Sequence, residues 1–198
     1  MHIGPKYKIA RRVGAPIFEK TQTQKFALRA ERKSKTAKFG KQKSEYGLQL
    51  NEKQKARFTY GLSEKQFFNY VKEVLHKKTA HPTQTIFENL ERRVDNAVYR
   101  LGIAPTRRAA RQMVSHGHIT VNGKKITIPS QRLSMGDTVS VREGSTQNGL
   151  FRRDNTATAP SWLSFDKQKN VAKVQGLPQF VSTENMFDLN AIIEFYSR

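Results

Sequence analysis

The 198-residue sequence predicts an α+β fold in which a helical first domain with a basic N-terminal arm precedes a small domain of two helices and antiparallel strands. Between residues 51 and 115, apolar residues recur at intervals of three and four, which is the spacing of a helix face. From Ile119 to Val141, short alternating runs are separated by glycine turns, as in hairpin strands. We place the first domain at residues 1–84 and the second at 85–176, with its core at 85–142.

Charge is a second strong signal. The net charge is +20, and the first 50 residues, with 13 basic and 3 acidic side chains, carry +10 of it. Such a balance favours a nucleic acid or an anionic membrane as partner. No run approaches the roughly 18 apolar residues of a membrane span, and the first residues lack the apolar core of a signal peptide. We therefore expect a nucleic-acid partner and no membrane association.

The arm covers the first 43 residues. It is basic, has no long apolar run, and is punctuated by Gly4-Pro5, Gly14, Pro16 and Gly40. Such a segment buries too little apolar surface to build its own core, so we expect an irregular arm that orders against a partner. The alternative is a solvated, disordered tail.

Two punctuated helices follow the arm. Asn51 is the expected N-cap of a helix that ends near Tyr60-Gly61, and Ser63 with Gln66 forms a capping box that opens a helix to about Lys78. Aromatic residues alternate here with Lys and Arg, which would suit base stacking, but their helical spacing favours a core role. The apolar face of the second helix comprises Phe67, Val71, Val74 and Leu75.

The second domain begins with two further helices. Thr85 and Glu88 suggest a capping box for a helix from Ile86 that Gly102 ends, with a core face of Ile86, Leu90, Val94, Ala97, Val98 and Leu101. Thr106 caps the next helix and Gly117 stops it. One face of that helix carries Arg107, Arg108, Arg111, Gln112 and Ser115, and the other carries Ala109, Ala110, Met113 and Val114. The cationic face is expected to meet a polyanion, because a guanidinium donates paired hydrogen bonds to phosphate.

Strands complete the small domain. Ile119 to Val121 alternate, Asn122-Gly123 is a strong two-residue hairpin signal, and Ile126 and Ile128 continue the alternation. A turn at Gly136-Asp137 leads into a third strand with Val139 and Val141. Residues 143–160 are expected to form a loop, and residues 171–174 a fourth strand. Trp162 and Leu163 are expected to pack back onto this domain.

The sequence offers little for catalysis. His116 and His118 point the same way on a strand, but no third metal ligand is near in sequence, so donation to phosphate or ribose is the favoured role. Asp95 is expected to pair with Arg92 three residues before it. There is no cysteine for a thiolate zinc site, no phosphate-binding glycine loop and no nucleophile elbow. We therefore expect a non-enzyme without a metal or other cofactor.

Several motifs in this chain resemble one family. In the second domain, a set of runs is similar to the RNA-binding domain named after the fourth protein of the small ribosomal subunit. These runs are Arg93-Val94-Asp95-Asn96, Tyr99-Arg100-Leu101-Gly102, Thr106-Arg107, Ala110-Arg111-Gln112, Ser115-His116-Gly117-His118 and Val121-Asn122-Gly123. The helical region from Glu52 to Phe67 and the terminal Glu194-Phe195-Tyr196-Ser197-Arg198 resemble the ribosomal protein family outside that shared domain.

The resemblance implies a structural protein that binds small-subunit ribosomal RNA at a junction in its five-prime domain, nucleates assembly and contributes to translational accuracy. It implies contacts with ribosomal protein five and with ribosomal protein three, and a bacterial-type cytoplasmic ribosome, an organellar ribosome being the alternative. The family's C-terminus returns to the helical region, so residues 177–198 would complete the first domain. Many members hold zinc through four cysteines in the arm, which this chain lacks.

The expected contact residues follow from the charge pattern and the resemblance. The RNA-binding set comprises Lys6, Arg11, Arg12, Lys53, Lys55, Arg57, Arg92, Arg93, Arg107, Arg108, Arg111, Gln112, His116, His118, Asn122, Lys124 and Lys125. By resemblance, a lysine cluster would face messenger RNA at the entry channel: Lys35, Lys38, Lys41 and Lys43.

Two alternatives stay open from the sequence. An RNA-modifying or ribosome-rescue factor could carry the same small domain, although only 56 residues after Arg142 leave little room for a catalytic domain. A DNA-binding protein would need a dimer or major-groove signature that we do not find.

Overall fold

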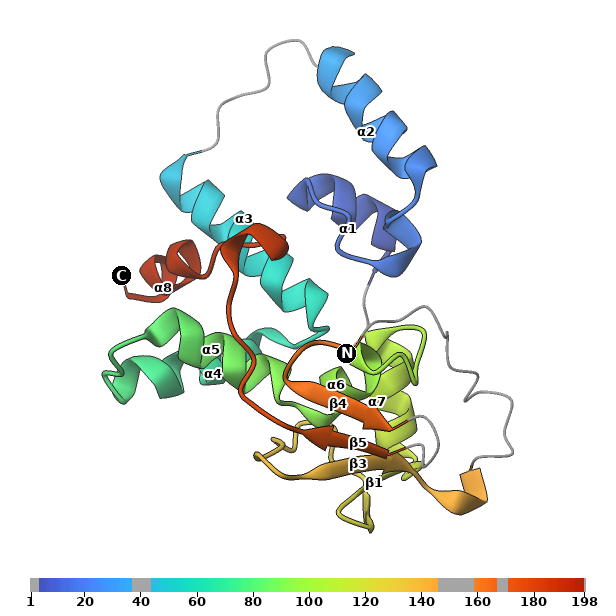
Figure 1. Ribbon diagram of the computed structural model, residues 1–198. Coiled ribbons are helices and arrows are strands. Elements are labelled where there is room, and N and C mark those ends of the chain that lie inside the picture. The colour runs from blue at the N-terminus through green and yellow to red at the C-terminus, as the bar shows by residue number, and fades with distance from the viewer. Residues whose placement is uncertain (1–3, 37–43, 146–158, 167–170, 198) are drawn as a thin grey trace. The chain divides into compact units, whose positions relative to one another are not determined.

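The computed structural model describes residues 4–36, 44–145, 159–166 and 171–197, and the chain forms two compact units (Figure 1). The first unit comprises Met1–Thr83 and Val181–Arg198, and the second comprises Gln84–Phe180. The first unit is helical, whereas the second combines helices with an antiparallel sheet. The predicted α+β class is therefore confirmed.

The described part of the N-terminal arm, residues 4–36, is folded, so the prediction of an irregular arm was wrong there. It contains α1 (Lys6–Val13), the 3-10 turn η1 (Glu19–Thr21) and α2 (Gln24–Thr36). The apolar residues are few, but one face of α1 and the chain after it bring them together, and α3 closes the cluster through Phe58. Asn51 Nδ2 also donates a hydrogen bond to the carbonyl of Val13 at 2.9 Å. The buried members are Ile9, Ala10, Val13, Ala15, Ile17 and Phe18.

The next helices are α3 (Glu45–Thr59) and α4 (Glu64–His76). The N-cap of α3 is Ser44, which accepts from the amide of Gly47, so the assignment of Asn51 as N-cap was wrong. Asn51 lies inside α3 with its side chain engaged by Val13. The capping box of Ser63 and Gln66 is confirmed, and Phe67, Val71 and Val74 are buried on α4.

The last helix, α8 (Leu189–Ser197), packs along α3 within the first unit (Figure 1). Gln49 Nε2 donates to Glu194 Oε2 at 3.0 Å, and the Tyr60 and Phe187 rings meet edge to face at 6.1 Å. Leu189 and Ile192 are fully buried. The first unit is therefore made of two segments that lie far apart in the sequence.

The predicted helix 86–101 is two helices, α5 (Pro82–Glu91) and α6 (Val94–Arg100). Arg93 between them has an extended backbone (φ −66°, ψ 137°) and forms a β-bridge with Arg132. The amide of Leu133 donates to the carbonyl of Arg92, which ties a distant loop into the break. Thr85 lies inside α5, which starts at Pro82, so its assignment as N-cap was also wrong. The predicted core face is nevertheless buried throughout.

In the described residues the sheet has five antiparallel strands in the order β2-β1-β3-β5-β4. They are β1 (Ile119–Val121), β2 (Lys124–Ile126), β3 (Thr138–Val141), β4 (Leu163–Asp166) and β5 (Val171–Val174). The β1–β2 turn has positive φ at both central residues, Asn122 (50°) and Gly123 (75°), which is the tight hairpin predicted. Ile128 lies beyond β2 and is 60% exposed, so placing it on the strand was wrong. β4 was not predicted.

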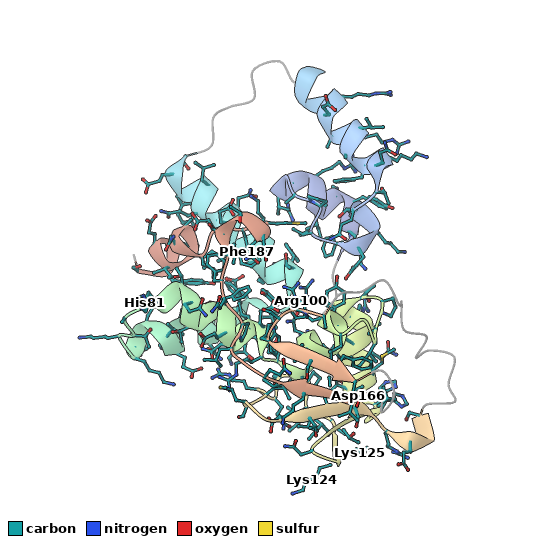
Figure 2. The ribbon with its side chains drawn as sticks, viewed as in Figure 1. His81, Arg100, Lys124, Lys125, Asp166 and Phe187 are labelled. Carbon is teal, nitrogen blue, oxygen red and sulfur yellow. The ribbon has the colours of Figure 1, made fainter. Side chains whose placement is uncertain are left out.

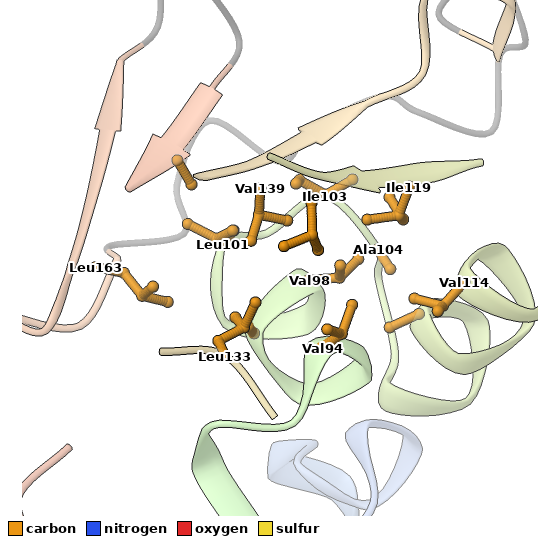
Figure 3. Close-up of a cluster of buried hydrophobic side chains, with 14 of the residues drawn as sticks. Val94, Val98, Leu101, Ile103, Ala104, Val114, Ile119, Leu133, Val139 and Leu163 are labelled. Carbon is orange, nitrogen blue, oxygen red and sulfur yellow. The ribbon is translucent and has the colours of Figure 1, made fainter. Parts of the chain in front are cut away.

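The core of the second unit lies between the helices and the sheet. Figure 3 shows Val94 and Val98 from α6 and Val114 from α7 (Arg107–Ser115) pointing toward Ile119 and Val139 of the sheet. Trp162 is 5% exposed and belongs to the same cluster, as predicted. This core fixes α6 and α7 against the sheet and leaves the polar side of each helix outside the core.

Candidate nucleic-acid interface

Helix α7 is amphipathic, as the sequence predicts. The Thr106 hydroxyl caps it by accepting from the amide of Ala109 at 3.1 Å. Ala110, Met113 and Val114 are buried on one side. Arg108 and Gln112 are exposed on the other, whereas Arg107 and Arg111 are half-buried. The two half-buried arginines are held by α6.

A polar seam joins α6 to α7. Arg111 donates from Nε (2.9 Å) and Nη2 (2.8 Å) to Oδ2 of Asp95. Arg107 Nε donates to Oδ1 of Asn96 at 2.9 Å, and its guanidinium lies 4.3 Å from the centre of the Tyr99 ring. Both contacts orient the arginine side chains of α7 along α6.

The seam continues to the end of α5. Glu91 accepts two hydrogen bonds of 2.9 Å from Arg100, which is labelled in Figure 2, and one of 2.9 Å from Asn96 Nδ2. Asp95 also accepts a bidentate pair from Arg93, with Nε–Oδ1 at 3.0 Å and Nη2–Oδ2 at 2.8 Å. Arg100 was not in the predicted contact set. Helical periodicity gave no reason to include it, although it lies in the run Tyr99-Arg100-Leu101-Gly102 that carries the family resemblance.

The predicted Asp95–Arg92 pair was wrong. Arg92 Nε donates instead to the carbonyl of Leu133 at 2.7 Å, because the break before α6 takes Arg92 off the face of Asp95. Arg93 is only 2% exposed, with its guanidinium on Asp95. Both arginines therefore hold the fold of the second unit together.

The β1–β2 hairpin carries a second basic group. Lys124 and Lys125 are exposed, and Figure 2 shows them at the hairpin. The Lys125 side chain lies over Gly117, where an added Cβ would come within 2.1 Å of its Cε. Asn122 is exposed, but its Oδ1 accepts from the amide of Thr138 at 2.8 Å and its Nδ2 donates to Asp137. Asn122 therefore secures the turn.

The two histidines lie beside α7. Their ring centres are 5.9 Å apart, and Nδ1 of His118 is 3.0 Å from the Ser145 hydroxyl. His116 is exposed and His118 is half-buried. Among the described residues no group of three His, Cys, Asp or Glu side chains could hold a metal ion.

Basic residues of α3 are engaged within the first unit. Lys53 is 7% exposed, donates to Glu64 at 2.7 Å and lies 4.4 Å from the Phe195 ring centre. Lys55 donates to Glu52 at 2.6 Å. Arg57 donates to Gln54 and lies over the Phe58 ring at 4.3 Å. All three were predicted to contact RNA, and the structure gives each an internal role.

Glu64 and Tyr196 are hydrogen-bonded to each other, and Glu64 also pairs with Lys53 and Arg57. Partial burial raises the pKa of Glu64, but the hydrogen bond and charge of Lys53 outweigh it and lower the pKa below its ordinary value. Burial, together with the Glu64 carboxylate that accepts from the Tyr196 hydroxyl at 3.0 Å, raises the pKa of Tyr196. This pair couples α4 to α8.

The arm contributes exposed cations. Arg11 and Arg12 are exposed, and Lys6 Nζ lies 5.7 Å from the centre of the Phe18 ring. On α2, the exposed Lys25, Arg29 and Arg32 recur at helical spacing and were missed because this stretch was expected to be irregular. Lys35 belongs to α2 where only the backbone is described, and Lys38, Lys41 and Lys43 lie outside the described residues.

These surfaces suit binding to a polyanion, since guanidinium and ammonium groups neutralise phosphates. In the part of the chain that the structure describes, no helix is long and apolar enough to cross a membrane.

Comparisons with known proteins identify the family of this chain. Residues 92–139 match the model of the S4 domain, and residues 1–92 match that of the ribosomal protein S4/S9 N-terminal domain. The relatives named small ribosomal subunit protein uS4 include those of Amoebophilus asiaticus (41% identical, over 100% of this chain and 98% of the relative), Aquifex aeolicus (40%, 100% and 98%) and Persephonella marina (39%, 99% and 98%). The chain therefore belongs to the small ribosomal subunit protein uS4 family, a family of structural ribosomal proteins and not of enzymes.

Proposed function

We propose that this protein binds small-subunit ribosomal RNA directly at a junction in the five-prime domain, nucleates assembly of the subunit and contributes to translational accuracy. The observation that supports this most directly is the cationic surface of the second unit. Arg100, Arg107, Arg108 and Arg111 gather along α6 and α7, and Lys124 and Lys125 extend it at the hairpin. This surface lies within the matched S4 domain.

Two contributions would give the affinity for RNA, one from charge and one from shape. Lysine and arginine neutralise phosphates and release counterions, which makes binding fall steeply with salt. The rigid unit of helices and sheet presents these charges in one arrangement, so the shape of the folded RNA supplies most of the specificity. The exposed cations Arg11, Arg12, Lys25 and Arg29 of the arm would add a second set of phosphate contacts.

The proposed contact set is smaller than the sequence suggested. Buried Arg93 and the loop-bound Arg92 are assigned to structure. Lys53, Lys55 and Arg57 are assigned to structure too, because they are paired internally and their side chains are at most 18% exposed. The set retained from the second unit consists of Arg107, Arg108, Arg111, Gln112, His116, His118, Lys124 and Lys125, with Arg100 added.

Partners and location follow from the family. We propose contacts with ribosomal proteins five and three of the small subunit, and with messenger RNA through the lysines near residue 40. A bacterial-type cytoplasmic ribosome is the proposed location, because the relatives named above are bacterial. An organellar ribosome is the alternative. A rescue or RNA-modification factor is disfavoured, since the ribosomal N-terminal domain is matched over residues 1–92.

The test is a footprint of the purified protein on isolated five-prime-domain ribosomal RNA across a range of salt, compared with Arg108→Ala/Lys124→Ala. Both side chains are exposed, so the double variant is expected to fold. Each lost phosphate contact should lower the slope of the logarithm of the affinity against the logarithm of the salt concentration by about one. Lys77→Ala/Lys173→Ala removes the same charge from exposed sites elsewhere and serves as the control.

Junction-specific protection that weakens in the first double variant and persists in the control supports the proposal. Protection scattered over any structured RNA, with affinity that merely follows salt, would reject it and favour the rescue factor.

A further inference from the structure

Two carboxylates lie almost fully buried beside the cationic surface. Glu91 is 1% exposed and Asp95 is 4% exposed. A buried carboxylate is costly unless it is paired and hydrogen-bonded, so its retention needs partners. Here the partners include arginines that remain in contact with solvent: the Arg100 side chain is 35% exposed and that of Arg111 is 29% exposed.

The hydrogen bonds fix three arginines at once. Arg111 is held on Asp95 through two nitrogens, and Arg100 is held on Glu91 by a bidentate pair. Asn96 relays the restraint by donating to Glu91 and accepting from Arg107. The Tyr99 ring lies beneath the Arg107 guanidinium. Each guanidinium plane is therefore set by protein groups before any ligand arrives.

An arginine that is free in solution loses rotamer freedom on binding, and one that is already fixed does not. We propose that Glu91 and Asp95 are positioning residues for RNA recognition, which orient Arg100, Arg107 and Arg111 for the phosphates of one folded RNA. This inference rests on the proposed function. If the two carboxylates position the arginines, their negative charges favour specific binding even though they repel the RNA phosphates.

A simple charge argument predicts the opposite sign, which makes the proposal testable. Asp95→Asn raises the net positive charge by one, so charge alone predicts tighter binding to every RNA. Positioning predicts about tenfold weaker binding to five-prime-domain ribosomal RNA, with unchanged or tighter binding to an unrelated structured RNA of the same length. Asp166→Asn changes the same charge at an exposed site of the same unit and is the matched control.

Asp95→Asn also weakens a buried ion pair, so the folded fraction of this variant is measured by thermal unfolding. If Asp95→Asn is unfolded, a second variant provides the test. Arg111→Lys keeps the charge but cannot reproduce the guanidinium geometry on Asp95. Positioning predicts the same selective loss for this variant. Tyr99→Leu, compared with Tyr99→Phe, removes the ring beneath Arg107 without changing any charge.

The outcomes separate the two proposals. Selective loss in Arg111→Lys and in folded Asp95→Asn, with Asp166→Asn binding both RNAs as tightly as wild type or more tightly, supports positioning. Equal or tighter binding of both variants to the specific RNA overturns it, as does an equal loss on both RNAs. A wild-type protein that shows no preference for the five-prime-domain RNA would reject the proposed function itself.

Discussion

The two units pair cations with carboxylates in opposite ways. In the first unit the cation is inside: the Lys53 side chain is 8% exposed and that of its partner Glu64 is 48% exposed. In the second unit the carboxylate is inside: Glu91 is 1% exposed and Arg100 is 35% exposed. The chemistry of the pairs is similar, but the buried member decides which charge faces the solvent. Charge along a sequence therefore does not reveal which residues can reach a ligand.

Removing a buried carboxylate should have the largest effect. Glu91→Ala leaves Arg100 and Asn96 without their shared acceptor inside the second unit. Asn96 is buried, and a buried donor that loses its acceptor costs about 1–3 kcal/mol, to which the cavity left by the side chain adds. Because Arg100 stays partly hydrated, the free energy of unfolding should fall by about 2–4 kcal/mol. The measurement is urea unfolding followed by fluorescence of Trp162, the single tryptophan, which lies in this core. A loss below about 1 kcal/mol would mean that Glu91 is not buried in solution.

Removing the buried cation of the first unit should cost less. Lys53→Met leaves Glu64 about half exposed and hydrated, and the methionine fills apolar space beside Phe195. We expect a loss of about 1–2 kcal/mol, seen as faster amide hydrogen exchange in α3 and α8, with RNA affinity unchanged at matched salt. If RNA binding weakened while α3 and α8 kept their protection, Lys53 would belong to the contact surface after all.

The comparison also predicts a pH dependence for the first unit. Because the pKa of Glu64 is lowered in the folded state, its contribution is present above the ordinary value of 4.5 and is lost as the pH falls below it. Because the pKa of Tyr196 is raised, its contribution is present below the ordinary value of 10.0 and is lost as the pH rises above it. Tyr196→Phe should remove the alkaline loss as measured by exchange in α8. An unchanged alkaline profile in that variant would assign the loss to another group.

The smallest effect is expected at the start of α7. Ala109→Glu places a carboxylate within reach of the Thr106 amide and near the positive end of the helix, which should stabilise the free protein by about 0.5 kcal/mol. The same charge should repel a phosphate bound there and weaken RNA binding. Ala109→Gln, which can form the cap without the charge, is the control. Unchanged affinity of Ala109→Glu at matched salt would count against a phosphate at this end of α7.

Local signals accounted for much of the fold. The capping box at Ser63, the amphipathic α7 and the Asn122-Gly123 hairpin each depend on residues close in sequence, so they could be recognised there. The break at Arg93 could not, because it depends on a β-bridge to Arg132, 39 residues away. The arm was misjudged for a similar reason, since its small core is completed by Phe58 of α3.

The candidate site was only half predictable. The faces of α7 follow from helical periodicity, which placed Arg107, Arg108 and Arg111 together. The partners that bury Lys53 or orient Arg100 come from tertiary packing, through Glu64 and Phe195 in one case and Glu91 in the other. No periodicity contains that information.

The return of α8 to α3 has a consequence for synthesis of the chain. The second unit is complete at Phe180, whereas the first lacks α8 until the ribosome has translated the residues that follow. Domains usually fold in the order in which they emerge. Here the later unit can close first, while Leu189 and Ile192 are still missing from the core of the earlier one. During that interval the side of α3 that α8 covers, with Gln49 and Lys53, stays exposed to solvent, and incomplete units of this kind are the ones prone to aggregation.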